Sequence, residues 1–72
     1  MIAAGGVLWA RVDEAAQQLG VTAGRVYDWK RRGLITRWYR VGRVLYVDFD
    51  QAADAELRTE ESATGAPRGP AR

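Results

Sequence analysis

The sequence predicts a mainly α-helical fold with one small β-hairpin. Three segments carry apolar residues at intervals of three and four positions, which is the period of an amphipathic helix: about 12–19, 23–32 and 49–59. A fourth segment, about 36–47, is rich in aromatic and β-branched residues and contains Gly42, which supplies the backbone freedom that a tight turn needs. We therefore expect three short helices, with the hairpin between the second and the third.

The length of the chain bounds its domain organisation. Its 72 residues leave room for a single small core. Residues 1–6 contain Ala and two Gly, and residues 60–72 are rich in Pro, Gly and Ala without apolar periodicity. We expect a flexible N-terminus at 1–6, one ordered domain at 7–59 and a disordered tail at 60–72.

The composition argues against catalysis and metal binding. The chain contains no Cys and no His, so it lacks thiolate metal ligands and the side chain that most often serves as a general base near neutral pH. Its only Ser, Ser62, lies in the expected tail, and its longest apolar run is far shorter than the ~20 residues that a membrane helix needs. We expect a cytoplasmic, non-enzymatic protein without cofactor, metal, small-molecule ligand or membrane contact.

Charge is distributed unevenly along the chain. The net charge is +2, from 11 Lys and Arg against 9 Asp and Glu. Residues 24–43 contain seven basic residues, six of them Arg, against Asp28 alone, whereas residues 44–63 have a net charge of −5. Arg offers a planar fork that binds phosphate or guanine through two hydrogen bonds. The basic segment therefore indicates a nucleic-acid partner, with a solvated charged face as the alternative.

The first two predicted helices have the outline of a helix-turn-helix. Gly20 ends the first helix, and Thr22 is a good N-cap for the second. On the second helix Val26 and Trp29 share the expected core face, so its polar residues face the other way. Such a helix can present its polar face to the major groove, which is wide enough for one helix.

The hairpin and the third helix carry opposite charges. We expect Arg40 and Arg43 at paired positions beside the hairpin turn, where like charges destabilise the pairing and a bound phosphate would relieve the repulsion. The alternative is that both side chains extend into solvent. Asp48 and Gln51 form a capping-box-like start for the third helix, whose acidic outer face we expect to point away from a nucleic acid.

These features together resemble the small excisionase proteins of phages and plasmids, and also the MerR-type and BldC-like regulators. The resemblance covers about residues 8–57 and rests on these runs: Leu19-Gly20-Val21-Thr22, Val26-Tyr27, Trp29, Gly33-Leu34-Ile35 and Arg40-Val41-Gly42-Arg43. It implies a winged helix-turn-helix, in which the second helix enters the major groove and the hairpin, as the wing, contacts the backbone or the adjacent minor groove. The chain has no counterpart of the coiled-coil helix and effector domain of full MerR regulators, so the resemblance does not extend to ligand or metal sensing.

The resemblance and the charge pattern together give the candidate DNA-binding residues. Those on or beside the second helix are Thr22, Arg25, Tyr27, Asp28, Lys30 and Arg31. Those in and before the hairpin are Arg37, Arg40, Gly42 and Arg43. Among these residues, Lys30 and Arg37 are expected to position phosphates, and Arg32, next to Arg31, is expected to do the same.

Several side chains of the second helix and the hairpin have two possible roles. Arg25 either contacts DNA or pairs with Asp28, three positions later. Asp28 either accepts a hydrogen bond from cytosine or orients Arg25 or Arg31, and we favour orientation. Tyr27 either contacts DNA or packs partly buried, and Trp38 either packs under the hairpin or is exposed.

The expected function is sequence-specific binding of double-stranded DNA, by an excisionase-type recombination directionality factor or by a small transcriptional regulator associated with the nucleoid. Besides double-stranded DNA, the expected partners are a site-specific recombinase or neighbouring copies of the chain on repeated sites. The alternative is a protein-interaction adaptor or a small phage packaging subunit, a role that the acidic third helix and exposed aromatic residues would suit.

Overall fold

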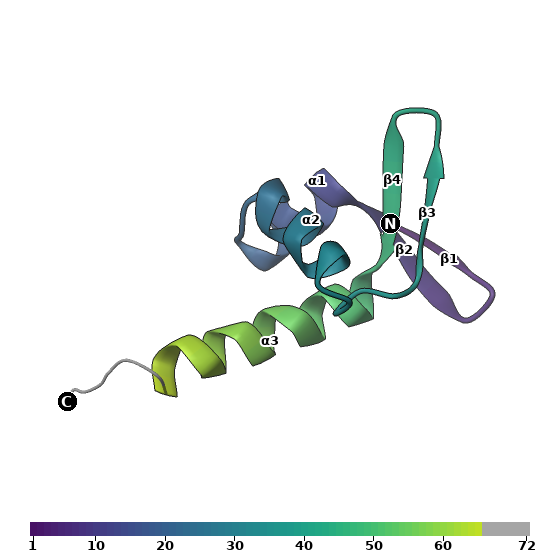
Figure 1. Ribbon diagram of the computed structural model, residues 1–72. Coiled ribbons are helices and arrows are strands. Elements are labelled where there is room, and N and C mark those ends of the chain that lie inside the picture. The colour runs from purple at the N-terminus through teal and green to yellow at the C-terminus, as the bar shows by residue number, and fades with distance from the viewer. Residues whose placement is uncertain (66–72) are drawn as a thin grey trace.

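The computed structural model describes the backbone of residues 1–65 and the side chains of residues 1–59 (Figure 1). Three helices and four strands follow one another in the order β1 (Ile2–Ala4), β2 (Val7–Arg11), α1 (Val12–Leu19), α2 (Ala23–Arg31), β3 (Trp38–Val41), β4 (Val44–Asp48) and α3 (Phe49–Gly65). The strands form one antiparallel sheet in the order β1-β2-β4-β3.

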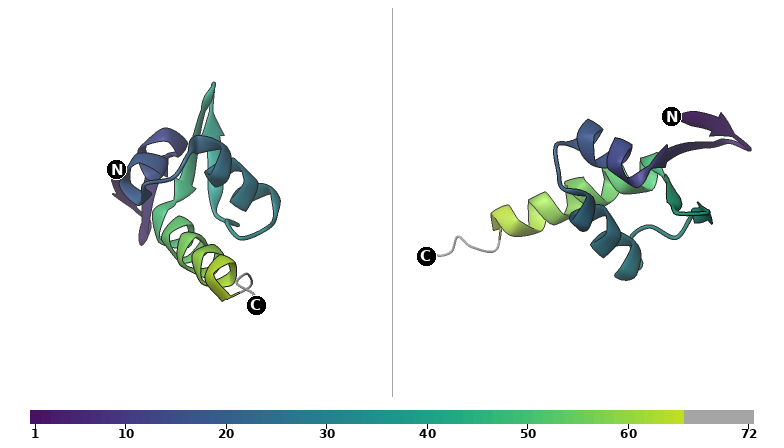
Figure 2. Two further views of the ribbon diagram at one scale, coloured as in Figure 1. Left: turned by 90° about the vertical axis from the view of Figure 1, so that its left-hand side faces the viewer. Right: turned by 90° about the horizontal axis from the view of Figure 1, so that it is seen from above.

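Two hairpins build the sheet. β1 pairs with β2 and β3 pairs with β4, and the two hairpins join where β2 lies beside β4, with Ala10 opposite Val47. Ala10, Leu45 and Val47 are buried on the face that the helices cover. The turn of the β3–β4 hairpin projects beyond the helices in both figures (Figures 1 and 2).

The sheet corrects the expected fold class. The domain is a small α/β fold with three helices and a four-stranded sheet, and the mainly α-helical winged helix-turn-helix with one hairpin was wrong. The two additional strands lie in residues 2–11, so the segment 1–6, expected as a flexible N-terminus, includes β1. Gly5 and Gly6 have φ of 62° and 79°, the positive values that a type I′ hairpin turn requires at both of its central positions. β2 then covers an edge of β4 that would otherwise be open.

The ends of α1 and α2 lie close to their predicted positions. Gly20, with a φ of 71°, ends α1, and its N–H donates to carbonyl groups in the last turn of that helix. Thr22 is the N-cap of α2, because its Oγ1 accepts a hydrogen bond from the N–H of Arg25 at 3.2 Å. These two caps turn the chain sharply between the helices and fix the direction in which α2 begins.

The third helix is longer than the sequence predicts. It begins at Phe49 and continues to Gly65, so residues 60–65 are helical and do not belong to a disordered tail. Residues 66–72 of that expected tail lie outside the described residues. Asp48 caps the helix, since its Oδ1 accepts hydrogen bonds from the N–H groups of Asp50 at 2.9 Å and Gln51 at 3.4 Å.

A small core lies between the helices and the sheet. Its buried apolar residues are Ala10, Val12, Ala15, Ala16, Val26, Trp29, Ile35, Leu45, Val47, Ala52 and Ala55. Many of these are Ala, so α1 and α3 can approach the sheet closely. Trp29 is the largest fully buried side chain and is 1% exposed, which confirms its predicted place on the apolar face of α2. Its burial fixes the rotation of α2 and therefore decides which residues of that helix face solvent.

Candidate nucleic-acid interface

One face of α2 is buried and the opposite face is open to solvent. Val26 and Trp29 form the buried face, whereas Gly24, Tyr27 and Arg31 are exposed. Tyr27 is 45% exposed, so one part of the side chain packs against the domain and the other part is open to a partner. A Cβ added at Gly24 would meet only the Oγ1 of Thr22, at 3.9 Å, so another molecule can approach the backbone of α2 closely at this point.

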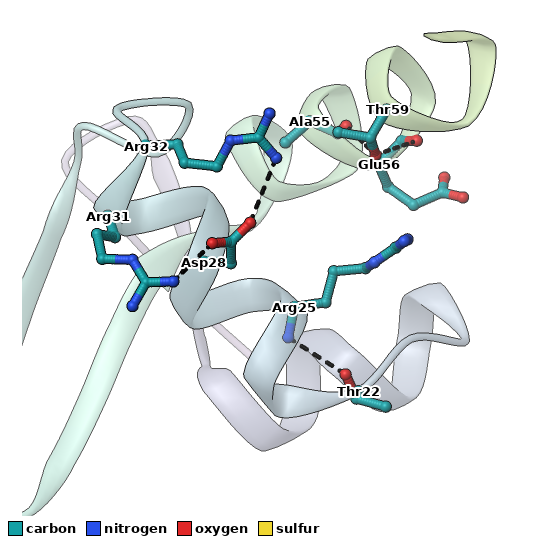
Figure 3. A network of polar contacts seen from close by, with 8 residues as sticks. All are labelled: Thr22, Arg25, Asp28, Arg31, Arg32, Ala55, Glu56 and Thr59. Carbon is teal, nitrogen blue, oxygen red and sulfur yellow. Dashed lines mark hydrogen bonds and ion pairs between the residues drawn. The ribbon is translucent and has the colours of Figure 1, made fainter. Parts of the chain in front are cut away.

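Asp28 holds two Arg side chains in the last turn of α2. Its Oδ1 accepts a hydrogen bond from Arg31 Nη2 at 2.8 Å, and its Oδ2 accepts one from Arg32 Nη1 at 3.3 Å (Figure 3). The hydrogen bond from Arg31, followed by that from Arg32, lowers the pKa of Asp28 below its ordinary value. The carboxylate therefore stays ionised and keeps the two guanidinium groups in place.

Arg25 is separated from this cluster. In Figure 3 its side chain extends from α2 toward α3, whereas Arg31 points to the opposite side. Six positions along a helix place two side chains about 120° apart around its axis, which explains the separation. The predicted alternative of an Arg25–Asp28 ion pair does not form: Asp28 pairs with Arg31 and Arg32, and the Arg25 side chain extends away from it (Figure 3).

The β3–β4 hairpin contributes two further basic side chains. Arg40 lies opposite Leu45, and Arg43 lies in the turn itself beside Gly42, whose φ is 61°. The sequence led us to expect Arg40 and Arg43 at paired positions. The register shows that they are not paired across the strands. Both are exposed, and neither makes an ion pair with any residue whose side chain the structure describes. Their charges are available to a partner.

A groove separates α2 from the hairpin turn. It has a volume of about 230 Å³ and is lined by Arg11, Val12, Asp13, Ala23, Tyr27, Arg43, Val44 and Leu45. Tyr27 borders it from the helix and Arg43 from the hairpin. Asp13 is the one acidic residue in this lining, and its Oδ1 lies 3.7 Å from Arg11 Nε. The groove thus has aromatic, apolar and basic walls.

Lys30 and Trp38 connect α2 to β3. The Nζ of Lys30 lies 4.0 Å from the centre of the Trp38 ring, a cation–π contact. Trp38 remains 43% exposed, so it is both a contact of α2 and part of the surface. Lys30 therefore holds the hairpin beside the helix, a role that the sequence-based prediction of a phosphate contact did not include.

Arg37 lies away from the other predicted residues. It precedes β3, at the end of the strand opposite the hairpin turn, and its Nη1 is 3.3 Å from Asp48 Oδ2. It also borders a hollow of about 440 Å³ that Asp50 and Asp54 line as well. The neighbouring carboxylates make this end of the sheet unfavourable for a phosphate, and Arg37 supports the start of α3 instead.

The outer face of the sheet carries an aromatic cluster that sequence reasoning missed. The Tyr39 ring stacks on Tyr46 with centroids 5.0 Å apart and meets Trp9 edge-on at 4.9 Å. Ile2 and Val41 on this face are 56% and 58% exposed. The sequence signal for this cluster is the alternation of these residues along the strands. It can be recognised only once Val7–Arg11 is assigned as a strand.

Comparison of the chain with protein-family models, curated proteins and solved structures gives no match. Within residues 1–65, no helix combines the length and the apolar character needed to span a membrane.

Proposed function

We propose that this protein binds double-stranded DNA sequence-specifically, with α2 in the major groove and the β3–β4 hairpin against the backbone or the adjacent minor groove. The observation that carries the proposal is the groove between α2 and the hairpin turn. Tyr27 borders it from the helix, Arg43 borders it from the hairpin, and the guanidinium of Arg43 has no acidic partner among the described side chains.

The dimensions of α2 suit this role. An α-helix with its side chains is about 10–12 Å across and the major groove is about 12 Å wide, so the groove admits α2, whose nine residues make it about 13 Å long. Arg31 follows Tyr27 by four positions, so both lie on the same exposed face. Gly24 leaves the backbone of the first turn bare, which allows the helix to approach base edges there.

The charge distribution orients the protein on DNA. Arg40 and Arg43 extend the positive charge of α2 onto the hairpin, while Asp50 and Asp54 belong to α3. Phosphates attract the two Arg residues and repel the two Asp residues, so the electrostatic field favours binding through α2 and the hairpin. Binding of this kind would associate the protein with the nucleoid.

Two roles fit this mode of binding: an excisionase-type recombination directionality factor, which would act with a site-specific recombinase, and a small transcriptional regulator. Either role would gain specificity from neighbouring copies on repeated sites, because one small module buries only about 600–1,000 Å² on DNA. Footprinting on genomic DNA, read for the number of repeats, their spacing and the bending of the duplex, distinguishes the two.

The test is duplex binding measured by fluorescence anisotropy over a series of salt concentrations. The expected affinity falls steeply with salt, and Arg43→Ala should reduce the slope of log K against log salt by about 0.9, the value for one phosphate contact. Arg58→Ala is the matched control. Arg58 lies on α3 and pairs with Asp54 at 3.0 Å, so its loss changes the net charge equally without touching α2 or the hairpin.

The two variants separate the proposal from simple attraction of a positively charged protein. If Arg43→Ala and Arg58→Ala reduce affinity and slope equally, the contact surface is not the one proposed. If the unaltered chain shows no salt-sensitive binding to duplex DNA, the proposed function is wrong.

The outer face of the sheet supports a second candidate function, that of a protein-interaction adaptor. Tyr39, Val41 and Val44 are large apolar or aromatic side chains exposed on one continuous face. Two results together would favour this candidate over DNA binding. The Tyr39→Ser variant would lose a protein partner that the unaltered chain binds, and neither the variant nor the unaltered chain would bind a DNA duplex.

A further inference from the structure

The hydrogen bonds around Asp28 place the two neighbouring Arg side chains differently. Asp28 Oδ1 accepts from Arg31 Nη2, and Oδ2 accepts from Arg32 Nη1, at 2.8 and 3.3 Å. Figure 3 shows the two guanidinium groups on opposite sides of the carboxylate, with Arg32 toward α3 and Arg31 away from it. Arg31 is therefore held on the side of α2 proposed to enter the major groove.

The contact with Asp28 leaves Arg31 able to donate two parallel hydrogen bonds. In a guanidinium group, Nη2 shares one two-donor edge with Nε and another with Nη1. Asp28 engages one N–H of Nη2, so the other N–H still belongs to a complete two-donor edge. The Arg31 side chain is 79% exposed, so that edge is accessible. Its shape matches the O6 and N7 acceptors of guanine in the major groove.

We propose that Arg31 recognises a guanine in the major groove and that Asp28 is the positioning residue that makes this contact specific. The inference rests on the proposed DNA-binding function and names the base that α2 recognises. An unrestrained Arg side chain samples many rotamers and binds any phosphate within reach. The carboxylate of Asp28 restricts Arg31 before DNA arrives and repels phosphates, so it favours a base edge over the backbone.

The first part of the test identifies the base. Selection from a duplex library with a randomised centre should yield a site with a preferred guanine, whose replacement by adenine lowers affinity about tenfold or more. Replacement of the same guanine by 7-deazaguanine should also lower affinity, because that base lacks the N7 acceptor. Both measurements use the full chain and the selected duplex.

The second part tests the two residues with conservative variants. Arg31→Lys keeps the charge but not the two-donor edge, so it should retain binding to a mixed-sequence duplex and lose the guanine preference. Asp28→Asn should bind the mixed-sequence duplex more tightly, because a negative charge is removed, and should lose most of the guanine preference. Arg32→Gln is the matched control, which should weaken binding to all duplexes equally and keep the preference.

The outcomes are distinguishable once circular dichroism shows that the variants unfold at similar temperatures. An unchanged guanine preference in Asp28→Asn overturns the positioning role while duplex binding, and with it the proposed function, stands. An unchanged preference in Arg31→Lys overturns the assignment of the base contact. Failure of the unaltered chain to bind any duplex overturns both the proposed function and this inference.

Discussion

Gln51 of α3 and Thr36 of the loop between α2 and β3 exchange two hydrogen bonds. Gln51 Nε2 donates to Thr36 Oγ1 at 2.9 Å, and Gln51 Oε1 accepts from the N–H of Thr36 at 2.9 Å and from that of Arg37 at 2.8 Å. One side chain of α3 therefore fastens the segment that leads from α2 into the hairpin. The position of the hairpin relative to α2 depends on this contact.

Gln51→Ala should destabilise the domain and weaken duplex binding without removing a charge. The loss of three partly solvated hydrogen bonds should lower the free energy of unfolding by about 1–2 kcal/mol. In a domain of this size each kcal/mol corresponds to about 4–8 °C in Tm, so differential scanning calorimetry detects the effect. Gln51→Glu keeps the acceptor oxygen, so its Tm should lie between that of Gln51→Ala and that of the unaltered chain. Equal Tm values for all three proteins would show that the contact does not hold the loop.

Gly24→Ala should separate stability from DNA binding. The added methyl group would lie 3.9 Å from the Oγ1 of Thr22, an ordinary van der Waals distance, and Ala is favoured over Gly inside a helix by up to about 1 kcal/mol, so thermal stability should rise. Duplex affinity should fall, because the methyl group lies on the exposed face of α2. Gly20→Ala is the contrasting variant: its φ of 71° makes any side chain costly by about 1–2 kcal/mol, so stability should fall. Unchanged duplex affinity in Gly24→Ala would indicate that the first turn of α2 does not approach DNA.

Thr22→Ala should destabilise α2 through loss of its N-cap. The hydroxyl group accepts the hydrogen bond from the N–H of Arg25, and removal of such a cap costs about 0.5–2 kcal/mol. Thr22→Ser retains the hydroxyl group and should be close to the unaltered chain. Urea unfolding followed by circular dichroism measures both, and equal midpoints for Ala and Ser would contradict a capping role.

Acid should destabilise the protein through Asp28 and Glu14. The hydrogen bond from Arg31 lowers the pKa of Asp28, and the hydrogen bond from the Met1 amino group, 2.9 Å away, lowers the pKa of Glu14. A carboxyl group whose pKa is lower in the folded state stabilises the fold above its unfolded pKa, and this contribution disappears as the pH falls through the folded value. The free energy of unfolding should therefore be level near neutrality and decline below about pH 4.

The variants Asp28→Asn and Glu14→Gln check the origin of this decline. Each removes one carboxyl group with a lowered pKa, so the free energy of unfolding, measured by urea at a series of pH values, should fall less steeply in each variant than in the unaltered chain. If the free energy of unfolding falls equally steeply with acid in the variants and in the unaltered chain, other groups cause the decline.

Much of the helical part of the fold could be predicted from the sequence. Gly20 and Thr22 mark the boundary between α1 and α2 by local chemistry, and Val26 and Trp29 show by their spacing which face of α2 is buried. Such signals act over one or two helical turns. They are therefore visible in the sequence without any knowledge of distant contacts.

The sheet could not be predicted in the same way. Val7–Arg11 becomes a strand because it pairs with β4, far along the chain. The two Gly residues before it suggest a flexible end in the sequence, but in the structure they form a hairpin turn. The ion pair of Arg37 depends equally on a distant residue, since its Nη1 lies 3.3 Å from Oδ2 of Asp48, at the end of β4. Charge counted along a sequence shows how many Arg residues a segment has, but their partners decide which remain available.

The pairing of β2 with β4 also determines how the protein tolerates shortening. Each hairpin can form locally, whereas Ala10 and Val47 must meet across about half of the chain before the sheet is complete. A chain that starts at Val12 would keep all of α2 and the β3–β4 hairpin but would leave β4 with unpaired backbone groups along one side. Such an open edge recruits strands from other molecules, so the shortened protein is expected to aggregate.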